Sequence, residues 1–258
     1  MHIFLTNDDG FSSKGIRYLA LSLSEIAKIT VIAPETEMSS CSGSLSLRKP
    51  LYLKRQKSYG ENIEVYSLSG TTGDCCKLAL EYWLQNDKPD LIISGMNCGF
   101  NTGSDCLYSG TVAGAMEGVF WGIPAMAVST DKSENIDYLL KAAEFSKEAV
   151  EKYFIKNKYQ GILNLNIPVI RLEKMNWNNV KVTPLGLQQY TNVIKQDKKD
   201  EEVMEFYMSG KLVMAENENT DVCWARNGFI TVTPLQWNQT DYKPVSYTHL
   251  RAHETRSN

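Results

Sequence analysis

Short apolar runs alternate with amphipathic stretches over the first two thirds of the chain. The first run is His2–Thr6, and after a polar turn the apolar positions recur at helical spacing. They are Ile16, Leu19, Ala20, Leu23, Ile26 and Ala27. A second run, Ile29–Ala33, stops at Pro34. Strand, helix and strand in this order predict a βαβ unit with parallel strands and a right-handed crossover.

The same alternation continues to Pro168. Further strands are expected at residues 62–68, Leu91–Ser94, Ala125–Ser129 and Ile162–Ile167. Three helices are expected between them: one capped by Asp74 with an inner stripe of Cys75, Leu78, Ala79, Tyr82 and Trp83, one from Ser109–Thr111 to Gly122–Pro124, and one over Ile136–Tyr153. Residues 95–103 are expected to form a glycine- and asparagine-rich loop. The pattern predicts an α/β fold with a mostly parallel, doubly wound sheet.

Beyond Pro168 the alternation stops, and only short strand-like pieces remain. They are Val180–Val182, Val203–Met208 and Phe229–Val232, and the charged segment Lys195–Glu202 between them is expected to be the tip of a protruding hairpin. A two-stranded arm is only marginally stable alone, so we expect this C-terminal β-hairpin to pack on a neighbouring subunit. We expect a single domain over residues 1–244, with a core at about 1–168 and the arm and closing strands at about 169–244.

The last residues, Val245–Asn258, carry no core pattern and read like translated vector or adapter sequence. We treat them as a non-native tail and exclude them from the fold. They contain His249 and His253, so the one histidine left is His2. Because His2 lies inside a predicted strand, we expect it to be a packed core residue and not a catalyst.

Composition restricts the possible functions. The 258 residues carry a formal net charge of −3, which disfavours a broad nucleic-acid surface but allows a small phosphorylated substrate. The six cysteines form no CxxC pair, which favours a reducing cytoplasm over a disulfide framework. No signal-peptide pattern and no run of eighteen apolar residues supports secretion or membrane insertion.

Oxygen-bearing side chains follow three of the predicted strands. Asp8 and Asp9 come after the first strand, a serine-rich loop over Glu35–Leu47 follows the second, and Asn97 follows the Leu91–Ser94 strand. Ligands collect outside the carboxyl ends of parallel strands, so these side chains are expected at one edge. Asp9-Gly10 is also common turn chemistry, and a simple tight turn is the alternative. Carboxylate, hydroxyl and amide oxygens suit Mg²⁺, Mn²⁺ or Ca²⁺, and two carboxylates leave open positions for water and substrate.

A second candidate feature is Ser109-Gly110-Thr111, which opens a predicted helix. Free backbone N–H groups, hydroxyls and the positive end of the helix dipole can hold a phosphate there, although the same residues can serve only as an N-cap. The chain has no GxxxxGK[ST] motif and no GxGxxG after a strand, and no histidine remains for a Ser-His-Asp triad. Walker-type, dinucleotide-dependent and serine-hydrolase chemistry are therefore disfavoured.

These motifs and their order resemble the SurE family of survival-protein nucleotidases. The resemblance covers residues 1 to about 240 and rests on Thr6-Asn7-Asp8-Asp9-Gly10, Ser12-Ser13-Lys14-Gly15-Ile16, Ala33-Pro34 with Ser39, Gly70-Thr71 with Asp74-Cys75, Ser94-Gly95-Met96-Asn97-Cys98-Gly99 with Asn101 and Gly103, Tyr108-Ser109-Gly110-Thr111-Val112, and Thr233-Pro234-Leu235. It implies a Rossmann-like core, a swapped C-terminal hairpin, and cytoplasmic homodimers or homotetramers. It also implies a metal-dependent 5'/3'-nucleotidase.

By motif position, the resemblance implies a specific site. The metal ligands fall on Asp8, Asp9, Ser39 and Asn97, and the phosphate contacts on Asn101, Ser109, Gly110 and Thr111. The chain departs from the family pattern at Thr72, where proline is common, and at Ser40-Cys41-Ser42-Gly43, so Ser40 is an alternative to Ser39.

The sequence thus predicts metal-assisted hydrolysis of nucleoside 5'-monophosphates, with 3'-monophosphates as further substrates. One divalent ion, Mg²⁺ or Mn²⁺, activates water, and Asp8 and Asp9 are the catalytic residues. Asp9 could also accept the proton of that water. Two alternatives remain: a non-enzymatic metal and phosphate sensor, and a nucleotide-sugar or cofactor binder in which Glu35 reads the ribose.

Overall fold

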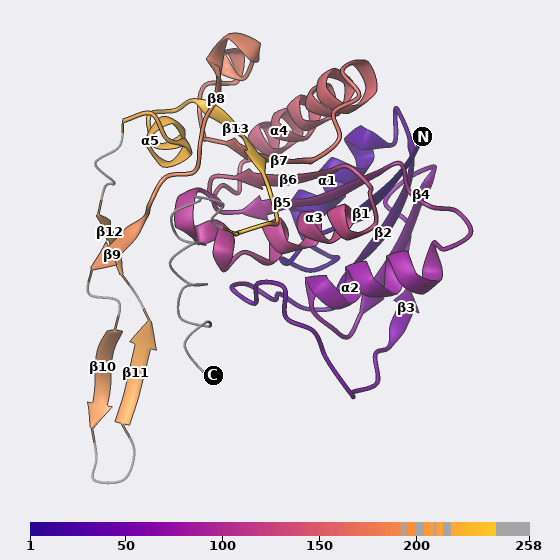
Figure 1. Ribbon diagram of the computed structural model, residues 1–258, viewed down its shortest axis with the longest axis horizontal. Helices are drawn as coiled ribbons and strands as arrows, with labels where there is room; N and C mark the ends of the chain where they lie inside the picture. Colours follow the sequence, from indigo (N-terminus) through magenta and orange to yellow (C-terminus); the bar gives the residue numbers. More distant parts are fainter. Residues whose placement is uncertain (192–193, 200–203, 209, 214–217, 241–258) are drawn as a thin grey trace, which may run out of the picture.

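A nine-stranded sheet forms the centre of the computed structural model, which describes residues 1–191, 194–199, 204–208, 210–213 and 218–240 (Figure 1). Its strand order is β3-β4-β2-β1-β5-β6-β7-β13-β8. The strands span β1 (His2–Thr6), β2 (Lys28–Pro34), β3 (Leu53–Arg55), β4 (Ile63–Leu68), β5 (Leu91–Cys98), β6 (Ala125–Thr130), β7 (Ile162–Ile167), β8 (Val180–Val182) and β13 (Ile230–Leu235). Two neighbouring pairs are antiparallel, β3 with β4 and β13 with β7, and the others are parallel.

Helices cover both faces of the sheet. α1 (Lys14–Leu23) and α4 (Ile136–Ala149) pack on one face, and α2 (Thr72–Leu78) and α3 (Gly110–Phe120) on the other. Shorter helical segments are α5 (Asp221–Arg226), the π-helical turns Ala79–Trp83 and Val150–Lys156, and the 3₁₀ turns Gly103–Leu107, Leu172–Lys174 and Trp177–Asn179. Among the described residues, no helix has both the length and the apolar character needed to span a membrane.

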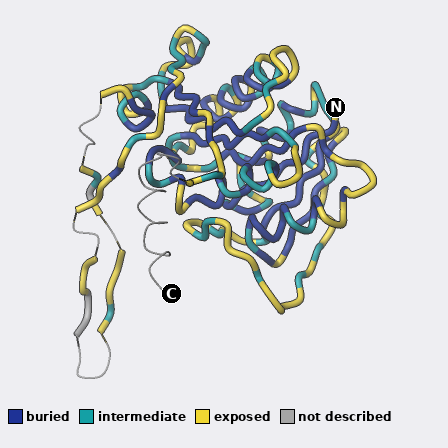
Figure 2. Tube along the Cα trace, viewed as in Figure 1, coloured by how far each residue is buried: buried dark blue, intermediate teal, exposed yellow. Residues whose placement is uncertain are grey.

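The apolar runs are continuous because the central strands are buried from both sides. In β1, Ile3 and Leu5 belong to the cluster under α1 and α4, and Phe4 belongs to the cluster under α2 and α3. Successive side chains of a strand point to opposite faces, so a strand with two covered faces has no polar face. Figure 2 shows the buried residues gathered along these strands.

The order of the parallel strands reverses at β1. From β1 the chain builds β2 and β4 on one side, and then β5, β6 and β7 on the other. The switch point therefore lies between β1 and β5, which pair in parallel from Ile3 with Leu91 to Thr6 with Ser94. In doubly wound sheets this is where the crevice for a ligand opens, at the carboxyl ends of the strands. The predicted α/β fold is confirmed.

Several local predictions were wrong. The N-cap of α2 is Thr71, not Asp74. Asp74 instead accepts a hydrogen bond from the Thr71 backbone N–H at 2.9 Å and completes a capping box. Tyr82 and Trp83 are exposed and lie in the π-helical turn that continues α2. β5 runs on through Cys98, so residues 95–98 form strand and not loop.

The hairpin arm is formed by β10 (Ile194–Lys199) and β11 (Met204–Met208), which pair antiparallel (Figure 1). At its base β9 (Gln189–Thr191) pairs with β12 (Lys211–Val213). The prediction placed the tip at Lys195–Glu202, but residues 194–199 are strand. Residues 200–203 and the predicted tail, Val245–Asn258, lie outside the described residues.

Candidate functional site

Asp8 and Asp9 lie in a turn that is stabilised by hydrogen bonds from a buried side chain. Gly10 follows them with a φ of 91°, a conformation that favours glycine. The buried Asn7 donates from Nδ2 to the Gly10 carbonyl at 3.1 Å and to Ser13 Oγ at 2.9 Å. The turn and the site are thus one feature, because the turn fixes two adjacent carboxylates at the end of β1.

Asp8 lies against the N-terminus of α3. Its Oδ1 accepts a hydrogen bond from the Thr111 hydroxyl. A Cβ at Gly110 would come within 2.9 Å of Asp8 Oδ2, so glycine is what allows the helix to approach this carboxylate. Ser109 is the N-cap, and its Oγ accepts from the Val112 N–H at 3.1 Å. Three of the four predicted phosphate residues, Ser109, Gly110 and Thr111, therefore lie at the helix end that contacts the first carboxylate.

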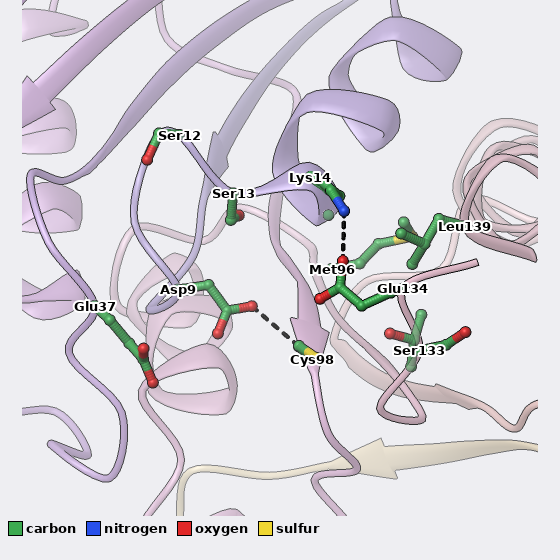
Figure 3. A pocket seen from close by; sticks show the side chains of 12 residues that line it. Asp9, Ser12, Ser13, Lys14, Glu37, Met96, Cys98, Ser133, Glu134 and Leu139 are labelled. Carbon is green, nitrogen blue, oxygen red and sulfur yellow. Dashed lines mark hydrogen bonds and ion pairs between the residues drawn. The ribbon is translucent and has the colours of Figure 1, made fainter. Parts of the chain in front are cut away.

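Asp9 has different neighbours, at the end of β5. Its Oδ2 accepts a hydrogen bond from the Cys98 backbone N–H at 3.0 Å (Figure 3). Asn97 immediately precedes Cys98. It donates from Nδ2 to the Gly99 carbonyl at 2.7 Å, and among the described residues its Oδ1 has no hydrogen-bond donor. The carboxylate and this amide oxygen thus come from adjacent strands at the switch point.

The loop after β2 is tied to both sides of this arrangement. The Met38 N–H donates to the Asp8 carbonyl at 2.7 Å, and the Ser42 N–H donates to the Tyr108 carbonyl at 3.1 Å. Ser39 is exposed and donates from Oγ to Glu37 at 2.6 Å. Ser40 is also exposed and has a φ of 59°. Both serines therefore lie in the segment that runs from the carboxylate turn toward α3.

Burial, and to a smaller extent nearby negative charges, raise the pKa values of both aspartates. Burial raises the pKa of Asp9 to about 6, opposed by the Cys98 hydrogen bond, and the negative charges of Asp8 and Glu37 add to the shift. The pKa of Asp8 is also raised, first by burial, although hydrogen bonding to Thr111 opposes this. Glu37 was missed in the sequence. Its position two residues before Ser39, in a loop expected at the same edge, could have indicated it.

Asn101 lies in a buried polar network and not at the N-terminus of α3. Its Nδ2 donates to Ser129 Oγ at 2.8 Å, and its carbonyl accepts from Asn164 and Asn166 at 2.7 and 3.2 Å. These bonds anchor the loop that leads to Ser109. A direct contact between Asn101 and phosphate stays a prediction.

The structure also shows the partners of two other side chains considered in the sequence, His2 and Glu35. His2 is buried and its Nε2 is 2.9 Å from Thr30 Oγ1, so it is a packed residue as expected. Glu35 forms an ion pair with Lys54 at 2.6 Å. Within the described ranges, no group of three or more His, Cys, Asp or Glu side chains could hold a metal ion by itself. A metal ion held by Asp8 and Asp9 would therefore need neutral oxygen ligands as well.

The fold and the site define a Rossmann-like α/β protein with a pair of carboxylates at the switch point of its sheet. Comparison with known families is consistent with this: residues 3–192 match the family model of survival protein SurE. The chain belongs to the SurE family, as the sequence motifs predicted.

Relatives match over almost the whole chain. It is 38% identical to 5'-nucleotidase SurE of Caldanaerobacter subterraneus over 246 residues, 94% of each chain. It is 37% identical to 5'-nucleotidase SurE of Clostridium botulinum over 253 residues, 96% of this chain and 98% of that one. The crystal structure of the SurE protein from Aquifex aeolicus superimposes with a TM-score of 0.82 at 32% identity, covering 97% of this chain and all of that chain.

Proposed function

We propose that this chain is a metal-dependent 5'-nucleotidase that hydrolyses nucleoside 5'-monophosphates, and 3'-monophosphates as further substrates, to nucleoside and phosphate. Relatives named 5'-nucleotidase SurE support the reaction class. The observation that carries the proposal is the position of Asp8, between the N-terminus of α3 and the neighbouring carboxylate of Asp9. A phosphate held by the helix would lie directly beside two acidic ligands.

The residues at this site fit a divalent cation. Burial first, and repulsion from the nearby negative charges second, raise the pKa values of Asp8 and Asp9, so keeping both carboxylates ionised here costs free energy. A cation relieves that repulsion. We assign Asp8, Asp9, Ser39 and Asn97 as ligands of one Mg²⁺ or Mn²⁺ ion, because all four offer hard oxygen atoms. When bound, such an ion supplies a water with a lowered pKa and polarises a phosphoryl oxygen.

The side chains and backbone of this protein supply the remaining functions in the proposal. Ser109, Gly110 and the start of α3 bind the phosphoryl oxygens through N–H groups, the Ser109 hydroxyl and the helix dipole. Thr111 orients Asp8. Asp9 accepts the proton of the attacking water, because its carboxylate lies next to the position assigned to the ion. Asn101 holds the loop before Ser109 through Ser129 and Asn166.

We also propose that the functional form is a homodimer or homotetramer in which the hairpin arm packs on another subunit. The side chains on the hairpin support this proposal. One face of the hairpin carries three exposed apolar side chains, those of Met204, Phe206 and Met208. An apolar two-stranded ribbon gains stability when a partner covers it.

The decisive experiment measures phosphate release from 5'-AMP, 3'-AMP and p-nitrophenyl phosphate after complete chelation and after Mg²⁺ or Mn²⁺ is added back. We expect turnover only with metal. Turnover that survives full chelation would contradict the metal proposal. Binding of metal and phosphate without turnover of any ester would favour the sensor alternative.

A further inference from the structure

A cavity of about 340 Å³ adjoins the proposed site on the side of Asp9. It opens between the start of α1, the end of β5 and the loop that joins β6 to α4 (Figure 3). Asp9 and Glu37 line it next to the carboxylate turn, and Lys14 and Glu134 line it farther away. Its volume is in the range of small-ligand pockets, which start at about 300 Å³.

The cavity lies on the other side of the carboxylate turn from the phosphate position. Asp8 contacts α3 through Thr111 and Gly110, whereas Asp9 contacts Cys98, which lines the cavity. A phosphomonoester with its phosphate at α3 must direct its ester oxygen away from the helix. The alcohol half of such a substrate would then lie on the side of Asp9, where the cavity is.

The lining indicates what kind of alcohol fits. Three carboxylates, those of Asp9, Glu37 and Glu134, face one cation, Lys14, which is already paired with Glu134. Carboxylates accept hydrogen bonds from hydroxyl groups and disfavour a second anionic group. Met96 and Leu139 add apolar surface. A neutral group that combines hydroxyls with an apolar face suits these walls, and a nucleoside is such a group.

We propose that this cavity is the nucleoside subsite and that Glu134 is a specificity-determining residue that accepts a hydrogen bond from a sugar hydroxyl. The proposal rests on the proposed function, because it names where the leaving alcohol lies. Lys14 donates to Oε2 of Glu134 and holds that carboxylate over the cavity, while Oε1 has no hydrogen-bond donor among the described residues. That oxygen is the acceptor offered to the sugar.

The first test compares a substrate that has a sugar with one that lacks it. In the metal-replenished enzyme, Glu134→Ala is expected to lower kcat/KM for 5'-AMP about tenfold, mainly through KM, because a hydrogen bond to a charged group is lost. For phenyl phosphate the decrease is expected to be at least about threefold smaller. Glu144→Ala is the matched control, because Glu144 also forms an exposed ion pair with a lysine but lies outside the cavity. Equal decreases for both esters, or an equal effect of the control variant, would overturn the proposal.

The second test does not depend on turnover. Cys98 is an exposed free thiol that lines the cavity, and Cys223 on α5 is a free thiol elsewhere. Adenosine, which carries no phosphate, is expected to slow alkylation of Cys98 by iodoacetamide several-fold, and to leave the rate at Cys223 unchanged. Rates are read by mass spectrometry of the two peptides. Unchanged alkylation of Cys98 at saturating adenosine contradicts the subsite.

The two tests separate failure of the subsite from failure of the proposed function. If the wild-type enzyme hydrolyses both esters but adenosine does not protect Cys98, the reaction stands and the subsite is wrong. If the wild-type enzyme hydrolyses neither ester but adenosine protects Cys98, the nucleoside subsite stands and the hydrolase function is wrong.

Discussion

The hydroxyl of Thr111 donates a hydrogen bond to Oδ1 of Asp8, and both side chains are almost completely buried, at 0% and 4% exposure. Water therefore cannot take the place of either partner. Thr111 was predicted to contact phosphate, but in the structure its hydroxyl is directed to a carboxylate. The consequence is that one proposed metal ligand has a fixed orientation before any ligand binds.

The role of this hydrogen bond can be tested with a pair of variants. Thr111→Val keeps the shape of the side chain but removes the hydrogen-bond donor. An unpaired buried acceptor costs about 1–3 kcal/mol, and Asp8 is then free to turn. We therefore expect kcat/KM for 5'-AMP to fall at least about tenfold. Thr111→Ser keeps the hydroxyl and should stay within about threefold of wild type. Steady-state kinetics at saturating Mn²⁺ measure both. Equal loss in the two variants would show that packing, and not the hydrogen bond, is what matters.

The sequence could predict which residues meet at the site, but not all of their partners. Asp8 and Asp9 follow β1 and Asn97 lies near the end of β5, and the rule that parallel strands end at one edge brings them together without further information. The partners of Thr111 and Asn101 depend on side-chain directions that strand spacing does not define. Asn101 is directed to Ser129, and Thr111 to Asp8, only because of how α3 and β6 pack.

The pKa of Asp9 predicts how stability of the metal-free protein depends on pH. In the unfolded chain the value is 3.8, and in the folded chain it is about 6, so the folded state holds the proton more tightly. Ionisation of Asp9 therefore costs nothing below pH 3.8, and the cost grows through this window to about 3 kcal/mol above pH 6. Asp9→Asn removes the cost, so we expect it to stabilise the metal-free protein at pH 7.5 by up to about 3 kcal/mol and far less at pH 4.

Urea unfolding with a chelator present measures this difference. Asp87→Asn is a control of opposite sign, because Lys28 and His2 lower the pKa of Asp87. That variant should lose stability at neutral pH and show no difference at low pH. If Asp9→Asn lowered the free energy of unfolding at pH 7.5 without metal, burial of the ionised Asp9 carboxylate would not destabilise the folded protein as we infer.

The ligand assignment predicts that either of two single substitutions abolishes activity. Asp8→Asn and Asn97→Ala each remove one oxygen ligand at the end of a strand, and we expect turnover of 5'-AMP to fall by at least about 10³-fold with the fold intact. The same variants should lose the rise in Tm that Mn²⁺ causes in the wild type, because that rise reports binding to the native state. Circular dichroism checks the fold. A wild-type rate in either variant would show that the assigned ligand is wrong.

Glu37 was not identified in the sequence because its relation to the carboxylates depends on how the loop after β2 folds back. The Met38 N–H bonds to the Asp8 carbonyl, and this places the Glu37 charge near both aspartates. An irregular loop has no periodicity from which that return could be predicted, so the position of Glu37 two residues before Ser39 was the one signal in the sequence.

Removal of the Glu37 charge should weaken metal binding more than catalysis. We expect Glu37→Gln to raise the Kd for Mn²⁺ about three- to tenfold, because fewer negative charges face the ion, with kcat at saturating metal within about threefold of wild type. Glu35→Gln is the matched control, since Glu35 pairs with Lys54 and should leave the Kd unchanged. Calorimetric titration measures the Kd, and an unchanged value for Glu37→Gln would show that this charge is screened from the ion. A large loss of nucleotide affinity in Glu35→Gln would instead favour the alternative in which Glu35 reads the ribose.

The hairpin arm offers a prediction about assembly. Phe206 lies opposite Gln196 and Met208 opposite Ile194, so Phe206, Met208 and Ile194 share one face of the ribbon, whereas Tyr207 points to the other. We expect the double variant Phe206→Ser and Met208→Ser to shift the oligomer toward monomer in light scattering, because the apolar face that a partner would cover is lost. Tyr207→Ser, on the opposite face, should leave the oligomeric state unchanged. Truncation after residue 244 should leave it unchanged as well. A monomeric wild type, or an unaltered mass in the double variant, would contradict the assigned role of the arm.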